Sequence, residues 1–195
     1  MRHSLILFFS ISWILLSAQD KQDLSDLSPE EFYTFIFETK ITEEEDFQKG
    51  IPNGEIFSDS TFLTINGDEL SFIDTEYELT VVDFWFKGCS GCKQEKEFVK
   101  QVIEKYEDDP RIRFVAITPT DEKGIERVIK KHGDYYKDII SVGGFKNCEL
   151  LFKFKGFPRH VLVDNNGRVL ATYFVPIFNA GIQKEYEKRI LSFLR

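Results

Sequence analysis

Residues 81–93 read VVDFWFKGCSGCK, an apolar run that ends at two cysteines, Cys89 and Cys92. The apolar run predicts a buried strand, and the polar stretch that follows predicts the start of a helix. Because the two cysteines lie three residues apart at this junction, their sulfurs can meet without the rest of the fold closing a loop. The stretch therefore predicts a reversible disulfide and a site of thiol chemistry.

The remaining cysteine and histidine content argues against a structural role for the pair. With Cys148 the chain has three cysteines in 195 residues, too few for the disulfide framework of a small secreted domain. A zinc site would need two ligands besides Cys89 and Cys92, and Cys148, His132 and His160 stand unpaired along the sequence. We therefore expect no bound metal and no other cofactor.

Composition and charge exclude some classes of partner. Hydrophobic residues make up 42% of the chain, with 20 phenylalanines, enough to fill a core without disulfide staples. The formal net charge is −8, and the sequence shows no basic cluster. We therefore expect neither nucleic acid nor an anionic membrane surface as a partner.

The first 18 residues predict a signal for export. A basic start at residues 1–3 precedes an apolar run at 5–16 and then Ser17-Ala18, the pattern of a secretory signal cleaved after Ala18. The alternative is an uncleaved membrane anchor, although the run is shorter than the ~20 residues of a spanning helix. We expect an exported protein, periplasmic or extracellular, with no membrane contact after cleavage.

Residues 19–54 are predicted to form an extension ahead of a main domain at 55–195. Ser28-Pro29 with the glutamate at position 31 predicts a short helix to about residue 39. The acidic run at 43–46 predicts a solvated connector.

The main domain is predicted to alternate strands and helices. The expected elements in chain order are a hairpin at 62–73 around Asn66-Gly67, a buried strand at 79–86, a helix after Cys92, a strand at 111–118, a helix at 120–132, a loop at 135–144, a helix at 147–154, a second hairpin with strands at 160–164 and 168–174, and a final helix capped by Asn179. Because a helix joins strands 79–86 and 111–118, these should run parallel. The hairpins add antiparallel strands, so the sheet should be mixed.

This order of elements resembles the thioredoxin fold, and two motifs carry the resemblance. VVDFW at 81–85 with CSGCK at 89–93 looks like the active-site strand and dithiol, and GFP at 156–158 looks like the cis-proline loop. The chain is most similar to the exported TlpA/ResA-like branch, from its predicted signal, its opening hairpin and Glu95.

The resemblance implies an α/β thioredoxin fold with a mixed central sheet flanked by helices. It also implies an extracytoplasmic thiol-disulfide oxidoreductase, commonly a reductase. Its partners would be a protein or small-molecule disulfide as substrate and a thiol-disulfide protein as electron donor. Two departures from the family pattern put substrate choice and redox potential in doubt. Gly88 replaces the aromatic residue that usually precedes the first cysteine, and Arg159 replaces the threonine that usually follows the proline.

The expected mechanism assigns different roles to the two cysteines. Cys89, at the start of the helix, should be the exposed nucleophile, because the positive end of the helix lowers its pKa. Cys92 should be the resolving thiol. Asp83, six residues ahead of Cys89, is the candidate base, since burial raises the pKa of a carboxyl group. The alternative is that Asp83 is merely a tolerated buried polar group.

Four further residues are candidates for the site. The resemblance implies that Pro158 is cis and that Phe157 pairs with an extended substrate. Glu95 and Trp85 are auxiliary candidates, and Glu95 is explained equally well as a first-turn glutamate favoured by the helix dipole.

Three more residues are expected to stay outside the chemistry. We assign no catalytic role to Lys87. Cys148 should be a small buried hydrophobe, and His132 a dipole partner at a helix end.

Rival functions remain open at this point. A disulfide oxidase or isomerase would use the same residues. A copper chaperone of the same fold would need a wider cysteine spacing, and a redox-inactive binding module would leave the thiols idle. A peroxiredoxin is disfavoured, because Phe86 stands where that class has a threonine.

Overall fold

The computed structural model describes residues 50–73, 76–133, 136–154, 156–173, 177 and 180–194. The predicted signal at 1–18, the helix near 28–39 and most of the acidic connector lie outside these residues, as does the predicted cap Asn179. The domain boundary at residue 55 stays a prediction, although Ile51 already packs into the core. In the described residues no helix is both long and apolar enough to cross a membrane.

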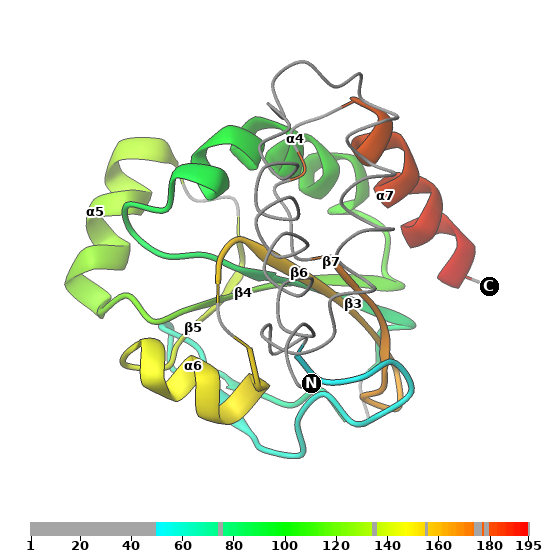
Figure 1. Ribbon diagram of the computed structural model, residues 1–195, viewed down its shortest axis with the longest axis horizontal. Coiled ribbons are helices and arrows are strands. Elements are labelled where there is room, and N and C mark those ends of the chain that lie inside the picture. Colours follow the sequence, from blue (N-terminus) through cyan, green and yellow to red (C-terminus); the bar gives the residue numbers. More distant parts are fainter. Residues whose placement is uncertain are drawn as a thin grey trace, which may run out of the picture. The chain divides into compact units, whose positions relative to one another are not determined.

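A five-stranded mixed sheet forms the centre of the fold (Figure 1). Its strands, in spatial order, are β5 (Asp138–Ser141), β4 (Ile112–Thr118), β3 (Leu79–Phe84), β6 (Arg159–Asp164) and β7 (Val169–Tyr173). β3, β4 and β5 run parallel to one another, whereas β6 is antiparallel to both β3 and β7. The predicted parallel pair and the second hairpin are therefore confirmed.

Helices cover both faces of the sheet (Figure 1). One face carries α4 (Ser90–Tyr106), α5 (Glu122–His132) and α7 (Ala180–Phe193), and the other carries α6 (Phe145–Phe152) and the two-stranded sheet of β1 (Phe62–Leu63) and β2 (Glu69–Leu70). The predicted opening hairpin around Asn66-Gly67 is thus present.

Strand alternation divides the interior into two cores. On β3, Val82 and Phe84 join the aromatic core that includes Phe152 of α6. Asp83 points to the opposite face, where α4 and α5 pack, because successive side chains of a strand alternate between faces. This alternation places a carboxyl group under α4.

The segment predicted as a loop at 135–144 contains strand β5, so that prediction is wrong. β5 has four residues and pairs only with β4, at the edge of the sheet. Ile139 packs into one core and Ile140 into the other. A pair of apolar residues is too short to show a strand period in the sequence, and the strand is recognisable only from its pairing with β4.

Candidate active site

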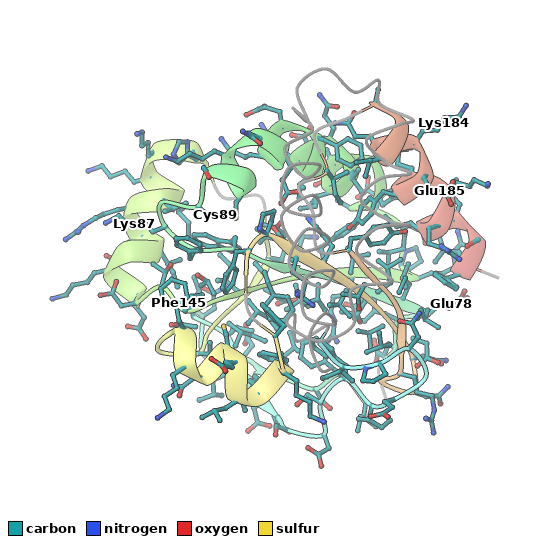
Figure 2. All side chains as sticks on the ribbon, in the orientation of Figure 1. Glu78, Lys87, Cys89, Phe145, Lys184 and Glu185 are labelled. Carbon is teal, nitrogen blue, oxygen red and sulfur yellow. A yellow bond between two sulfur atoms is a disulfide. The ribbon has the colours of Figure 1, made fainter. Side chains whose placement is uncertain are left out.

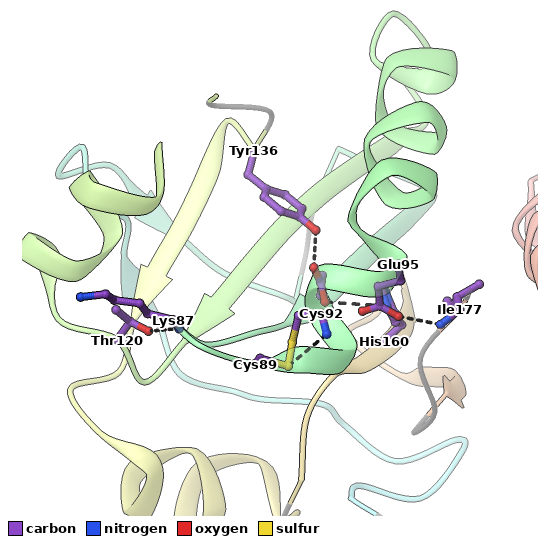
Figure 3. The surroundings of a disulfide bond; sticks show 9 residues. Lys87, Cys89, Cys92, Glu95, Thr120, Tyr136, His160 and Ile177 are labelled. Atoms are coloured by element: carbon purple, nitrogen blue, oxygen red, sulfur yellow. Dashed lines mark hydrogen bonds and ion pairs between the residues drawn. A yellow bond between two sulfur atoms is a disulfide. The ribbon is translucent and has the colours of Figure 1, made fainter. Parts of the chain in front are cut away.

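Cys89 and Cys92 form a disulfide at the N-terminus of α4, with an S–S distance of 2.03 Å (Figure 3). The chain leaves β3 and turns at Gly88, whose φ of 103° is a conformation that side chains with a Cβ rarely adopt. Cys89 is the N-cap of α4, and its Sγ accepts a hydrogen bond from the backbone N–H of Cys92 at 3.1 Å. That N–H and the helix dipole would stabilise a thiolate on Cys89.

The expectation that Cys89 is exposed does not hold for the disulfide form. Cys89 is only 3% exposed, whereas Cys92 is half-buried. The Sγ of Cys89 is bonded to Cys92 and held against the first turn of α4.

Asp83 lies behind the disulfide and is 7% exposed. The hydroxyl group of Tyr136 donates a hydrogen bond to Oδ2 of Asp83 (Figure 3), while Oδ1 has no hydrogen-bond partner among the described residues. Burial, with a smaller contribution from Glu95, raises the pKa of Asp83 to about 6, although His160 and Tyr136 oppose the rise. A carboxyl group with this pKa exchanges protons near neutral pH.

Glu95 is also buried, one turn of α4 beyond Cys92. Its Oε2 accepts a hydrogen bond from the backbone N–H of Ile177 at 2.7 Å, and its Oε1 lies 3.2 Å from Nε2 of His160. The interpretation of Glu95 as a first-turn glutamate favoured by the helix dipole is therefore wrong, because the first turn of α4 contains no acidic residue. Its carboxylate faces the interior and belongs to the same group as Asp83.

His160 is the residue of the site that the sequence does not reveal, because it stands alone among the candidate ligands along the chain. It is fully buried on β6, directly opposite Asp83 of β3, and its Nδ1 lies 3.3 Å from the hydroxyl group of Tyr186. Burial opposes a charge on the ring, but Glu95 and Asp83 outweigh burial and raise its pKa. Only the pairing of β3 with β6 brings this histidine to the two acids.

Asp83, Glu95 and His160 form what we call the inner cluster. Each offers one ligand atom within 4.8 Å of the others, and one imidazole with two carboxylates is a donor set that suits a divalent ion. In this structure His160 contacts Glu95, and Glu95 also accepts the N–H of Ile177, so an ion would have to displace these hydrogen bonds. The absence of metal stays a prediction.

Pro158 is preceded by a cis peptide bond, as the resemblance implied. Phe157 before it belongs to an aromatic cluster with Phe86 and Phe145, whose ring centroids lie 5.0–5.7 Å apart in pairs. Phe145, the first residue of α6, is 56% exposed. The cluster Phe86, Phe145 and Phe157 thus gives the site an exposed apolar flank.

The other residues singled out from the sequence have varied surroundings. Trp85 is half-buried against the α4-side core. Cys148 is buried, and burial raises the pKa of its thiol to about 12, in agreement with an inert role. Arg159 is buried on the opposite face from His160, with its guanidinium 4.3 Å from the ring centroid of Phe154. The side chain of Arg159 therefore packs against the aromatic core.

A cleft of about 330 Å³ opens beside the disulfide, between the start of α4 and helix α5. Both cysteines, Asp83 and Glu95 line it, together with a group of five basic side chains that we call the cationic rim: Lys87, Lys93, Lys96, Arg127 and Lys131. The conclusion that the chain has no basic cluster is therefore wrong for the folded protein. The five residues are spread over 45 positions of sequence, and the packing of α4 beside α5 gathers them.

Comparisons with known proteins agree with this geometry. A family model described as thioredoxin-like matches residues 77–169. The thioredoxin-like protein YneN of Bacillus subtilis is 25% identical over 87 residues, which span 45% of this chain and only half the length of YneN.

Solved structures extend the likeness to most of the described domain. A Chlorobium tepidum protein assigned as the thiol:disulfide interchange protein DsbE has a TM-score of 0.62 at 22% identity, over 74% of this chain and 99% of that one. StoA of Bacillus subtilis has a TM-score of 0.52 at 17% identity, over 64% of this chain and 93% of its own. These likenesses show a shared fold. The residues matched by the family model contain β3, both cysteines and the cis-proline loop, so residues 77–169 form a thioredoxin-like domain.

Proposed function

We propose that this chain is an extracytoplasmic thiol-disulfide oxidoreductase that reduces protein disulfides through Cys89 and Cys92. The observation that carries the proposal is the disulfide at the N-terminus of α4 with the inner cluster directly behind it. The predicted signal at 1–18 supports the location, and the thioredoxin-like family supports the class of reaction.

The reaction begins from the reduced dithiol. The Cys89 thiolate attacks one sulfur of the substrate disulfide, that S–S bond breaks, and the first substrate thiolate leaves and takes up a proton. Cys92 then loses its proton and attacks Sγ of Cys89, which releases the second substrate thiolate. Two electrons pass to the substrate, whose two thiolates take up the proton of Cys92 and one proton from solvent, and the protein ends in the disulfide state of this structure. A reduced dithiol protein would restore the starting state.

Asp83 is the group in this site best placed to accept the Cys92 proton. Its carboxyl group lines the same cleft as Cys92, and its raised pKa of about 6 lets it take up and release a proton at neutral pH. His160 and Glu95 face it from β6 and α4. Together these three residues would hold the proton until the substrate thiolate needs it.

The direct test is reduction of insulin disulfides by the mature chain and by Cys89→Ser and Cys92→Ser variants. Both variants should lose turnover, and Cys92→Ser should trap a mixed disulfide visible by mass spectrometry. Cys148→Ala is the matched control, because its buried thiol has a pKa of about 12, and it should retain activity. Equal turnover by all four proteins would reject the proposal.

The equilibrium with glutathione tests the direction of the reaction. A potential near or below about −270 mV supports a reductase, and a potential near about −120 mV supports an oxidase instead.

A further inference from the structure

The cationic rim stands out because the chain as a whole is acidic. Five basic side chains line one cleft of a protein whose formal net charge is −8. The positive charge of the rim acts on His132 at the end of α5. Partial desolvation lowers the pKa of this histidine, and the ammonium groups of Lys96, Lys131 and Lys93 lower it further. Three lysines from two helices therefore act on the same small region.

The acidic groups near the rim leave most of this positive charge uncompensated. Asp83 and Glu95 also line the cleft, but both are buried: Asp83 accepts a hydrogen bond from Tyr136, and Glu95 contacts His160. Within the described part of the chain, Lys96 contacts the exposed Glu97 at 3.5 Å, and no ion pair is found for Lys93, Arg127 or Lys131. The rim thus has charge available for a ligand.

The disulfide lies between two unlike surfaces. On one flank are the aromatic residues Phe145 and Phe157, and on the other is the cationic rim. Phe86 lies between them, because it contacts both aromatic rings and also lines the cleft. Lys87 and Cys89 lie toward α5, and Phe145 lies on the side of α6 (Figure 2). A ligand that spans both flanks must cross the sulfurs, which suits an extended peptide better than a compact molecule.

We infer that the cleft binds the carboxylates of an acidic peptide segment that adjoins the disulfide-bonded cysteine of the substrate. The inference rests on the proposed function and names its substrate class. A nucleic acid or an anionic lipid would match the charge but would bring no disulfide to Cys89. The volume of about 330 Å³ is at the lower end of ligand pockets and accommodates one or two acidic side chains.

The test uses three short peptides whose single cysteine is disulfide-bonded to 2-mercaptoethanol. Their flanking residues are two glutamates, two glutamines or two lysines, and the small thiol is the same in all three. The reduced mature protein is mixed with each peptide, and the rate constant of reduction is measured by acid quench and chromatography. We expect the acidic peptide to react about tenfold faster than the neutral one at low salt. The basic peptide should react slowest, and high salt should narrow the differences.

Two variants with the same change of charge locate the effect. Lys93→Gln with Lys131→Gln should reduce the ratio of the acidic to the neutral rate constant toward one. Lys184→Gln with Lys188→Gln, on α7 at the opposite side of the molecule (Figures 1 and 2), should leave the ratio as it is. An equal loss of the ratio in both variants would assign the preference to net charge and overturn the inference.

Other outcomes separate this inference from the proposed function. Equal reduction of the three peptides would overturn the acidic segment while leaving the oxidoreductase in place. Failure to reduce any peptide or insulin would reject the proposed function itself. Glutathione disulfide is an additional arm: if it is reduced as fast as the acidic peptide and depends equally on Lys93 and Lys131, the ligand is a small anionic disulfide and not a peptide.

Discussion

The disulfide separates two groups of charged side chains that the fold treats in opposite ways. The inner cluster is buried, and its acids and histidine contact one another. The cationic rim lines an open cleft, and within the described residues only Lys96 of the rim has an acidic neighbour in ion-pair distance. A buried ionisable group must either pair its charge with an opposite charge or take its neutral form. A charged group at the surface is stabilised by water and stays available to a ligand.

This difference suggests a division of labour around one pair of sulfurs. In the proposed function, the inner cluster would accept the proton of Cys92, and the rim would attract the substrate before any bond changes. Substitutions in the inner cluster should therefore change stability and pH dependence. Substitutions in the rim should change substrate preference with little effect on stability.

The largest effect on stability is expected for Asp83→Asn. The pKa of Asp83 is about 6 in the folded protein, against 3.8 for a solvated aspartate, so the folded state binds this proton more tightly than the unfolded state does. The contribution of Asp83 to the free energy of unfolding is fully present below about pH 4 and is lost as the pH rises through about 6. The variant keeps an acceptor for Tyr136 but cannot ionise, and it should be more stable at pH 8 by about 3 kcal/mol.

Urea unfolding at pH 4.5 and at pH 8 measures this gain. The increase should be about 3 kcal/mol at pH 8 and about 1 kcal/mol at pH 4.5, where Asp83 is mostly protonated in the folded parent protein and mostly ionised in the unfolded chain. A gain of the same size at both pH values would mean that ionisation of Asp83 is not the cause. Release of the substrate from the mixed disulfide should be slower in the variant, because Cys92 has lost the nearby base.

An intermediate effect is expected for His160→Gln. Glutamine preserves a polar contact with Glu95, but it cannot carry the charge that lowers the pKa of Asp83. The pKa of Asp83 should therefore rise further, with Glu95 still repelling its ionised form. The variant should also lower the free energy of unfolding by about 1–2 kcal/mol, because the buried hydroxyl group of Tyr186 and the carboxyl groups around position 160 would have poorer hydrogen-bond partners.

The pH dependence of mixed-disulfide release separates this electrostatic role from a purely structural one. When the rate of mixed-disulfide release is plotted against pH, the midpoint assigned to Asp83 should move to higher pH in His160→Gln. A purely structural role of His160 would lower this rate and leave the midpoint unchanged. Tyr186→Phe is a useful companion variant, because it removes the hydroxyl group near Nδ1 of His160 and leaves the imidazole in place. Tyr186→Phe should shift this midpoint less than His160→Gln does.

The sequence predicted the parts of this site that are local in the chain, and missed those that depend on strand pairing. Cys89, Cys92 and Asp83 lie on one strand, turn and helix, so their proximity follows from spacing. His160 lies 77 positions beyond Asp83, and its place in the inner cluster follows from the register of β3 with β6. The cationic rim was missed for the same reason, since α4 and α5 each contribute only part of it.

Length explains the error at β5, and backbone geometry explains the departure at Gly88. A four-residue edge strand carries too few positions to show alternation.

Gly88 has a φ of 103°, so an aromatic residue at this position would be strained in this turn. The sequence showed the substitution but not the conformation that favours it.

The smallest effect on stability is expected in the cationic rim. Exposed charges contribute little to folding, so Lys93→Gln with Lys131→Gln should change the free energy of unfolding by less than about 0.5 kcal/mol. The same variant should raise the pKa of His132, because both lysines lower it in the parent protein. A titration followed by NMR of the His132 ring measures this rise, with Lys184→Gln and Lys188→Gln as the control that leaves it unchanged. An unchanged pKa would mean that the lysines do not act together on the cleft, and the contrast with the inner cluster would then rest on burial alone.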